Sequence, residues 1–146
     1  MKIFLTGKHG QIGFALHKKL VSLGEVIATD RNELNLENSD AIRAFIEKIK
    51  PDIIINAAAY TDVDKAESDI ELAHKVNSEA PGVLAEKATQ LNIPIIHFST
   101  DYVFDGLKNE PYIEADQPNP QSAYGQTKWK GEEALRNHKK HIILRT

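Results

Sequence analysis

The sequence predicts an α/β protein built on a doubly wound parallel sheet, and three features of its 146 residues lead to this prediction. Short apolar runs alternate with longer segments of helical periodicity along the whole chain. The runs are rich in β-branched residues and consist of consecutive apolar residues instead of an alternation of apolar and polar ones. This pattern is typical of strands buried on both faces of a parallel sheet. A glycine-rich turn follows the first run. The strands are expected at residues 3–5, 26–28, 53–55, 95–98 and 142–144.

Helical segments separate these runs, as parallel strands joined by right-handed crossovers require. The first segment ends before Gly24, a residue suited to the position that follows a helix. The second begins at a cap formed by Asn38 or Ser39. The third contains Pro81, which predicts a kink or a new helix start there. The helices are expected at residues 11–23, 39–50, 70–91 and 128–137.

Composition narrows the classes of protein to which the chain can belong. Its 41% hydrophobic and 27% charged content is typical of a globular domain, and a net charge of -3 with interleaved signs argues against a nucleic-acid partner. The absence of cysteine excludes disulfides and thiolate metal sites. Because the first apolar run is too short for a signal peptide or a membrane span, we expect a cytoplasmic protein with no membrane partner.

The histidines are scattered, and we expect no metal site. His9 falls in the glycine-rich turn and His97 in a strand. His138 and His141 lie near the end of the chain among lysines, which favours a solvated basic patch over a pair of ligands.

The glycine-rich turn lies at the first junction of a strand and a helix. Gly7 permits a tight turn, Gly10 lets the backbone approach a pyrophosphate, and Gly13 allows the helix to pack closely on the sheet. The spacing is G-x-x-G-x-x-G and departs from the G-x-G-x-x-G of many dehydrogenases, so a turn that only needs flexible residues is the alternative. The position of the turn favours a dinucleotide site and therefore a Rossmann-type domain.

The choice of cofactor stays open. Asp30 ends the second strand, where a carboxylate can accept hydrogen bonds from an adenosine ribose and so favours NAD, although an ordinary turn residue is the alternative. Arg31 follows and could instead neutralise the 2′-phosphate of NADP. NADPH or NADH, or both, are therefore expected. The small residues 57–59 after the third strand would let a cofactor approach, or would simply allow tight packing.

A tyrosine and a lysine lie four residues apart in the last helical region. Tyr124 and Lys128 would share one face of a helix, where a cation can lower the pKa of a phenol toward the working range. Thr100 and Asp101 follow the fourth strand, at the edge where open α/β sheets bind ligands. A strand-terminating polar cluster is the alternative for these residues. The long polar segment 101–123 is expected to be functional.

These residues resemble those of the extended short-chain dehydrogenase/reductases, and within them the dTDP-4-dehydrorhamnose reductase family. The matching segments span nearly the whole chain. The segments that begin at Asn56 and at Ser99 are the most specific, because other extended relatives differ there. The segments are G-K-H-G-Q-I-G from Gly7, N-A-A-A-Y-T-D-V-D-K-A-E from Asn56, S-T-D-Y-V-F-D-G from Ser99 and Y-G-Q-T-K from Tyr124.

The resemblance implies a reductase acting on a nucleotide sugar. Tyr124 would donate the proton, and Lys128 would lower its pKa and hold the nicotinamide ribose. Thr100 would polarise the C4 ketone, with Asp101 beside it in the sugar site. The implied reaction is hydride transfer from NADPH or NADH to the C4 keto group of dTDP-4-dehydro-L-rhamnose, giving dTDP-L-rhamnose. The cofactor would contact Gly7, Gly10, Gln11, Ile12, Gly13, Asp30, Arg31, Asn35, Leu36, Ala59, Tyr60, Thr61, Tyr124 and Lys128.

Two other functions fit the same resemblance. A sugar-nucleotide epimerase also uses a tyrosine and a lysine but keeps its nicotinamide tightly bound. A non-catalytic regulatory subunit would bind dinucleotide to control a partner. A 4,6-dehydratase is disfavoured, because Tyr102 stands after Asp101 where those enzymes carry a glutamate.

The chain ends within or just after its last expected strand. We therefore expect residues 1–146 to form one NAD(P)-binding domain that is truncated before the C-terminal substrate-binding part. Such a chain would bind cofactor weakly and would not turn over substrate. The sequence leaves the oligomeric state open, and a homodimer is one of the arrangements that the sequence allows.

Overall fold

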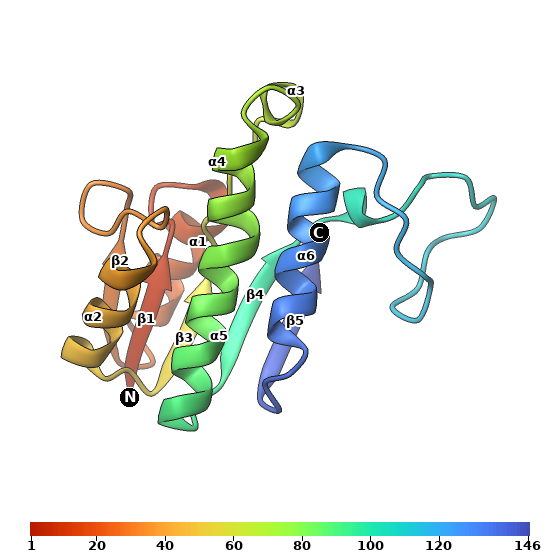
Figure 1. The fold of residues 1–146 in the computed structure, drawn as a ribbon. Helices are drawn as coiled ribbons and strands as arrows, with labels where there is room; N and C mark the ends of the chain where they lie inside the picture. The colour runs from red at the N-terminus through yellow and green to blue at the C-terminus, as the bar shows by residue number, and fades with distance from the viewer.

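The computed structural model describes residues 1–146 and contains a five-stranded parallel sheet in the order β2-β1-β3-β4-β5 (Figure 1). Each strand contains one of the predicted apolar runs, so all five predicted strands are confirmed. Because the strands are parallel, their carboxyl ends lie at one edge of the sheet, with Thr6 of β1 opposite both Thr29 and Asn56. The strands are β1 (Lys2–Thr6), β2 (Glu25–Thr29), β3 (Ile53–Asn56), β4 (Ile95–Ser99) and β5 (His141–Arg145).

Helices cover both faces of this sheet, which confirms the doubly wound α/β class. On one face, Phe4, Ile54 and Ile95 pack with buried residues of α2, α5 and α6 in the larger core cluster. On the other face, Ile3 and Leu5 pack against α1. The helices are α1 (Gln11–Leu20), α2 (Ser39–Ile49), α3 (Val63–Ala66), α4 (Ile70–His74), α5 (Ala80–Leu91) and α6 (Ala123–Leu135), with a π-helical turn (Lys75–Glu79) and a 3-10 turn (Asp101–Val103).

Two predicted helix ends were wrong. Helix α1 ends at Leu20 rather than at residue 23. Gly24 does not act as a left-handed cap: a Cβ there would lie 2.1 Å from the carbonyl oxygen of Met1, so this glycine allows the chain to pass close to the start of the sheet. Helix α6 begins at Ala123, five residues before the predicted start at 128, because the Ser122 hydroxyl accepts a hydrogen bond from the Gly125 N–H at 3.1 Å.

Residues 70–91 form α4, the π-helical turn and α5, so the predicted interruption is present. Pro81 has no N–H to donate to the carbonyl of Asn77, four residues earlier. That carbonyl instead faces helix α6, where a Cβ at Gly131 would lie 2.2 Å from the Asn77 oxygen. The π-helical turn and α6 are therefore in backbone contact.

His138 differs from the prediction of a solvated basic patch, because it is buried. Its ring bonds the Thr89 hydroxyl at 2.9 Å and the Ile93 carbonyl at 2.8 Å, so this imidazole joins the turn after α6 to the end of α5. His141 is partly buried and bonds the carbonyl of His138. No helix has the length and apolar character needed to cross a bilayer.

Candidate functional site

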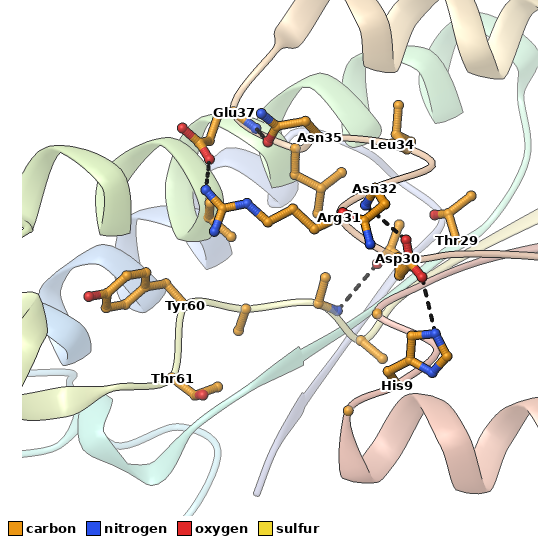
Figure 2. A pocket seen from close by; sticks show the side chains of 18 of the residues that line it. His9, Thr29, Asp30, Arg31, Asn32, Leu34, Asn35, Glu37, Tyr60 and Thr61 are labelled. Carbon is orange, nitrogen blue, oxygen red and sulfur yellow. Dashed lines mark hydrogen bonds and ion pairs between the residues drawn. The ribbon is translucent and has the colours of Figure 1, made fainter.

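A cavity of about 870 Å³ lies at the carboxyl ends of β1, β2 and β3 (Figure 2). The glycine-rich turn forms one wall. Gly7 has a φ of +75°, and a Cβ there would lie 2.8 Å from the backbone of Ala58; a Cβ at Gly13 would lie 2.0 Å from the Gly7 carbonyl. Only glycine fits these two positions, and the resulting turn brings the free N–H groups of the first turn of α1 to the cavity. This backbone cradle fits a dinucleotide pyrophosphate.

Most residues predicted to contact a cofactor line this one cavity. Gly13 lies behind the turn, and Tyr124 and Lys128 lie on α6 outside the cavity. Sequence reasoning missed His9, Asn32, Glu37, Leu72 and Val76, of which Leu72 and Val76 come from α4 and the π-helical turn. The predicted residues in the lining are Gly7, Gly10, Gln11, Ile12, Asp30, Arg31, Asn35, Leu36, Ala59, Tyr60 and Thr61.

Asp30 lies at the centre of a charged cluster on the cavity wall. Its carboxylate accepts hydrogen bonds from the N–H groups of Asn32 and Glu33 and lies 3.0 Å from the His9 ring (Figure 2). Lys8 lies 3.9 Å from the same carboxylate. Burial alone would raise the pKa of Asp30, but these N–H groups and the charges of Lys8 and His9 together lower it below its usual value. Asp30 is therefore held as an anion with free oxygen lone pairs for a ligand hydroxyl.

Arg31 points away from Asp30 along the cavity rim (Figure 2). Its guanidinium forms an ion pair with Glu37 at 2.5 Å, and its side chain is 73% exposed. The Arg31 guanidinium is therefore available as a cation for a 2′-phosphate. Breaking its surface ion pair with Glu37 would cost little free energy.

Tyr124 and Thr100 meet beside the carboxyl end of β4. Tyr124 is 9% exposed, and its ring packs edge-on against Tyr102 with the centroids 5.6 Å apart. Burial raises the pKa of Tyr124, an interaction with Thr100 opposes this rise, and the charge of Asp101 adds to it. Thr100 caps the 3-10 turn by accepting from the Tyr102 N–H at 3.2 Å. The predicted pair of a phenol and a hydroxyl is therefore brought together.

Lys128 lies four residues after Tyr124 on the same helix, as predicted, and its ammonium is bonded inside the protein. Its Nζ donates to the carbonyl oxygen of Phe98 at 2.6 Å, and the residue is 1% exposed. Burial lowers the pKa of Lys128 to about 8, although Glu132 acts in the opposite direction.

Asn77 connects the cavity to helix α6, and sequence reasoning missed it. Its amide accepts from the Tyr60 N–H at 2.8 Å and donates to the Tyr60 carbonyl at 3.0 Å. The same amide nitrogen donates to the Thr127 hydroxyl at 3.2 Å. Asn77 therefore positions the loop that lines the cavity relative to α6. No local signal marks this residue, because its partners lie 17 and 50 positions away.

A buried polar row crosses the sheet below the cavity. Thr6 Oγ1 donates to Asn56 Oδ1 at 2.6 Å, and Asn56 Nδ2 lies 3.0 Å from Nδ1 of His97. Because the Asn56 amide nitrogen can only donate, His97 carries its proton on Nε2, which has no hydrogen-bond partner. Burial, together with the charge of Lys128, holds the pKa of His97 well below its usual value.

The chain is similar to dTDP-4-dehydrorhamnose reductases in both sequence and fold. A dTDP-4-dehydrorhamnose reductase from Burkholderia thailandensis is 47% identical over 135 residues, which cover 92% of this chain and 45% of that protein. A crystal structure of a dTDP-4-dehydrorhamnose reductase from Clostridium acetobutylicum has a TM-score of 0.96 at 44% identity and covers 99% of this chain and 52% of that chain. The dTDP-4-dehydrorhamnose reductase from Bacillus anthracis in complex with NADP has a TM-score of 0.94 at 33% identity, with the same coverage.

The chain spans about half the length of the curated relatives it matches. The family model described as the RmlD substrate binding domain matches residues 1–146, which is every residue of the chain. The family resemblance found in the sequence is thereby confirmed, and the chain belongs to the RmlD substrate binding domain family.

Proposed function

We propose that the full-length protein is an oxidoreductase that reduces the C4 keto group of dTDP-4-dehydro-L-rhamnose to dTDP-L-rhamnose with NAD(P)H. One observation carries the proposal: the glycine-lined cavity and the Tyr124–Thr100 pair belong to one edge of the sheet and are joined through Asn77. The relatives are named dTDP-4-dehydrorhamnose reductases, and these names support a nucleotide sugar as the substrate.

The side chains of this site are suited to distinct tasks. Tyr124 would donate the proton to the developing alkoxide, and Thr100 would hydrogen-bond the ketone oxygen and polarise it. Asp101 would lie beside the sugar. The cofactor would supply the hydride when bound. Lys128 would have to turn from the Phe98 carbonyl to reach a ribose, and its charge near Tyr124 would then favour the phenolate.

We propose that the protein uses both NADPH and NADH. The Asp30 carboxylate suits the ribose 2′-hydroxyl of NADH. Arg31, once released from Glu37, and the neighbouring Lys8 and His9 suit the 2′-phosphate of NADPH. The bound NADP in the relative from Bacillus anthracis supports the second half of this proposal.

The location and assembly of the protein are also proposals. We propose that it acts in the cytoplasm, where nucleotide sugars and reduced nicotinamides are available as substrates. Residues 1–146 would form one NAD(P)-binding domain, with the grip on the sugar supplied elsewhere in the full-length protein. A homodimer is our hypothesis for the oligomeric state, and sedimentation velocity of the full-length protein tests it.

The first experiment is a turnover assay with the full-length protein. Oxidation of NADPH and NADH would be followed with dTDP-4-dehydro-L-rhamnose for the wild type, Tyr124→Phe and Tyr112→Phe. A general acid contributes about 100- to 10,000-fold, so kcat of Tyr124→Phe should fall within that range. Tyr112 bonds Asp105 in the loop after the 3-10 turn and serves as the matched tyrosine control.

A folded wild type that binds cofactor without oxidising it would contradict the reductase proposal. Interconversion of two nucleotide sugars on a retained nicotinamide would then point to an epimerase. Cofactor binding without any turnover would point to a regulatory subunit.

A further inference from the structure

We propose that Glu132 is a positioning residue of this site, which ties helix α6 to the carboxyl ends of β4 and β5 and supplies the counter-charge for the buried Lys128 ammonium. The proposal rests on the proposed function for its kinetic consequence only. Its structural and electrostatic consequences can be measured without turnover.

Glu132 is a fully buried carboxylate with every strong partner on another element. The Ser99 hydroxyl of β4 donates to its Oε1 at 2.6 Å. Arg145 of β5 donates through Nε at 2.9 Å and through Nη2 at 2.7 Å, so the guanidinium grips both carboxylate oxygens. Arg136, directly after the end of α6, is only a peripheral partner at 4.0 Å. A buried charge that loses its partners is strongly destabilising, so this arrangement fixes α6 in one place.

The residues that Glu132 joins are the neighbours of the reacting groups. Ser99 directly precedes Thr100, so the carboxylate holds the strand end that presents the polarising hydroxyl. Lys128 lies four residues before Glu132 on α6, and Tyr124 lies four residues earlier still. One carboxylate therefore sets the distance between the strand end and the helix that together form the site.

Glu132 also acts on Lys128 through its charge. The ion-pair partners of Glu132 are Arg136 and Arg145, so Lys128 stays near the carboxylate without a direct pair. Among the titratable groups on the elements packed against α6, Glu132 alone raises the pKa of Lys128, against the larger effect of burial. His97 on β4 is kept neutral next to Lys128, and Asp101 in the 3-10 turn acts on Tyr124 instead.

The test is a titration of Lys128 in the full-length protein carrying Glu132→Gln. Lysine labelled with ¹³C at Cε reports the pKa by NMR, and Lys128→Met assigns the resonance. Glutamine keeps the size of the side chain but removes the negative charge, so the pKa of Lys128 should fall below its wild-type value of about 8. The alkaline limb of the kcat profile should move to lower pH by the same amount. Displacement of α6 should lower kcat by about tenfold or more.

Further variants separate charge from packing. Glu132→Asp keeps the charge while disturbing the contacts, so the pKa of Lys128 should stay near that of the wild type. Glu47→Gln removes the partner of the buried Lys87 at 2.7 Å, far from the site, and should leave Lys128 unaffected. If Glu132→Gln does not fold, the double variant Glu132→Gln/Arg145→Met is compared with Arg145→Met alone, so that only the carboxylate differs, and the pKa of Lys128 should be lower in the double variant.

An unchanged titration of Lys128 in folded Glu132→Gln, or equal titrations in folded Arg145→Met and the folded double variant, would overturn the proposal. A fall of the Lys128 pKa in Glu132→Gln, together with a wild type that does not oxidise NAD(P)H, would support the role of Glu132 and contradict only the reductase function.

Discussion

His97 shows how burial changes the chemistry of a single residue. It is fully buried in β4, and burial together with the charge of Lys128 holds its pKa well below the usual value. In the unfolded chain the imidazole takes up a proton near pH 6.5. The unfolded state therefore binds more protons as the pH falls below about 6.5, and the free energy of unfolding decreases by up to about 1.4 kcal/mol per pH unit. We expect His97→Asn, which keeps an acceptor for Asn56, to weaken this acid sensitivity between about pH 6.5 and 5. Urea unfolding at several pH values measures it, with the partly exposed His17→Asn as the control; equal slopes in wild type and His97→Asn would refute the expectation.

Helix α6 shows how one element depends on a glycine at its contact with another. A Cβ at Gly131 would lie 2.2 Å from the Asn77 carbonyl, whereas a Cβ at Gly82 would lie 3.4 Å from the Ala134 side chain at the same helix interface. We expect Gly131→Ala to cost about 1–3 kcal/mol of stability, since α6 must move away from the π-helical turn. Gly82→Ala is the matched control and should stabilise α5 by up to about 1 kcal/mol, because alanine loses less backbone entropy in a helix. Chemical denaturation of both variants gives the comparison. Equal effects of the two substitutions would mean that this contact does not position α6.

The cavity is a property of the whole molecule, because its lining extends from Thr6 to Val76 and includes the ends of β1, β2 and β3. A ligand that binds only the folded state stabilises it by about 2.7 kcal/mol at 100 times its Kd. We expect NADPH and NADH each to raise the Tm of the protein. Arg31→Ala should reduce the shift with NADPH and leave the shift with NADH nearly unchanged, because the guanidinium is suited to the 2′-phosphate alone. Arg43→Ala, which breaks an ion pair with Glu86 away from the cavity, is the control. A loss of both shifts in Arg31→Ala would contradict a role specific to the 2′-phosphate.

Features that depend on neighbours in the chain could be predicted from the sequence. Continuous β-branched runs located all five strands, since such runs favour a parallel sheet, although the edge strand β5 is only partly buried, with Ile142 52% and Leu144 41% exposed. The cap at Asn38 and the interruption near Pro81 follow from local backbone chemistry. The turn from Gly7 to Gly13 was predicted for the same reason, and most of the expected cofactor residues line one cavity beside it.

Features that depend on distant residues were decided by the tertiary structure alone. Asn77, Glu132 and His97 have no recognisable pattern, since their roles arise from partners on other strands and helices. The direction of Lys128 was likewise not predictable, because Y-x-x-x-K spacing places two side chains on one helix face but does not determine which acceptor the ammonium reaches. Local sequence thus determined the elements and the phosphate-cradling turn, through propensities that act within a few residues. The tertiary structure decided burial, charge pairing and pKa values, because these depend on which distant groups come within a few ångströms in the folded chain.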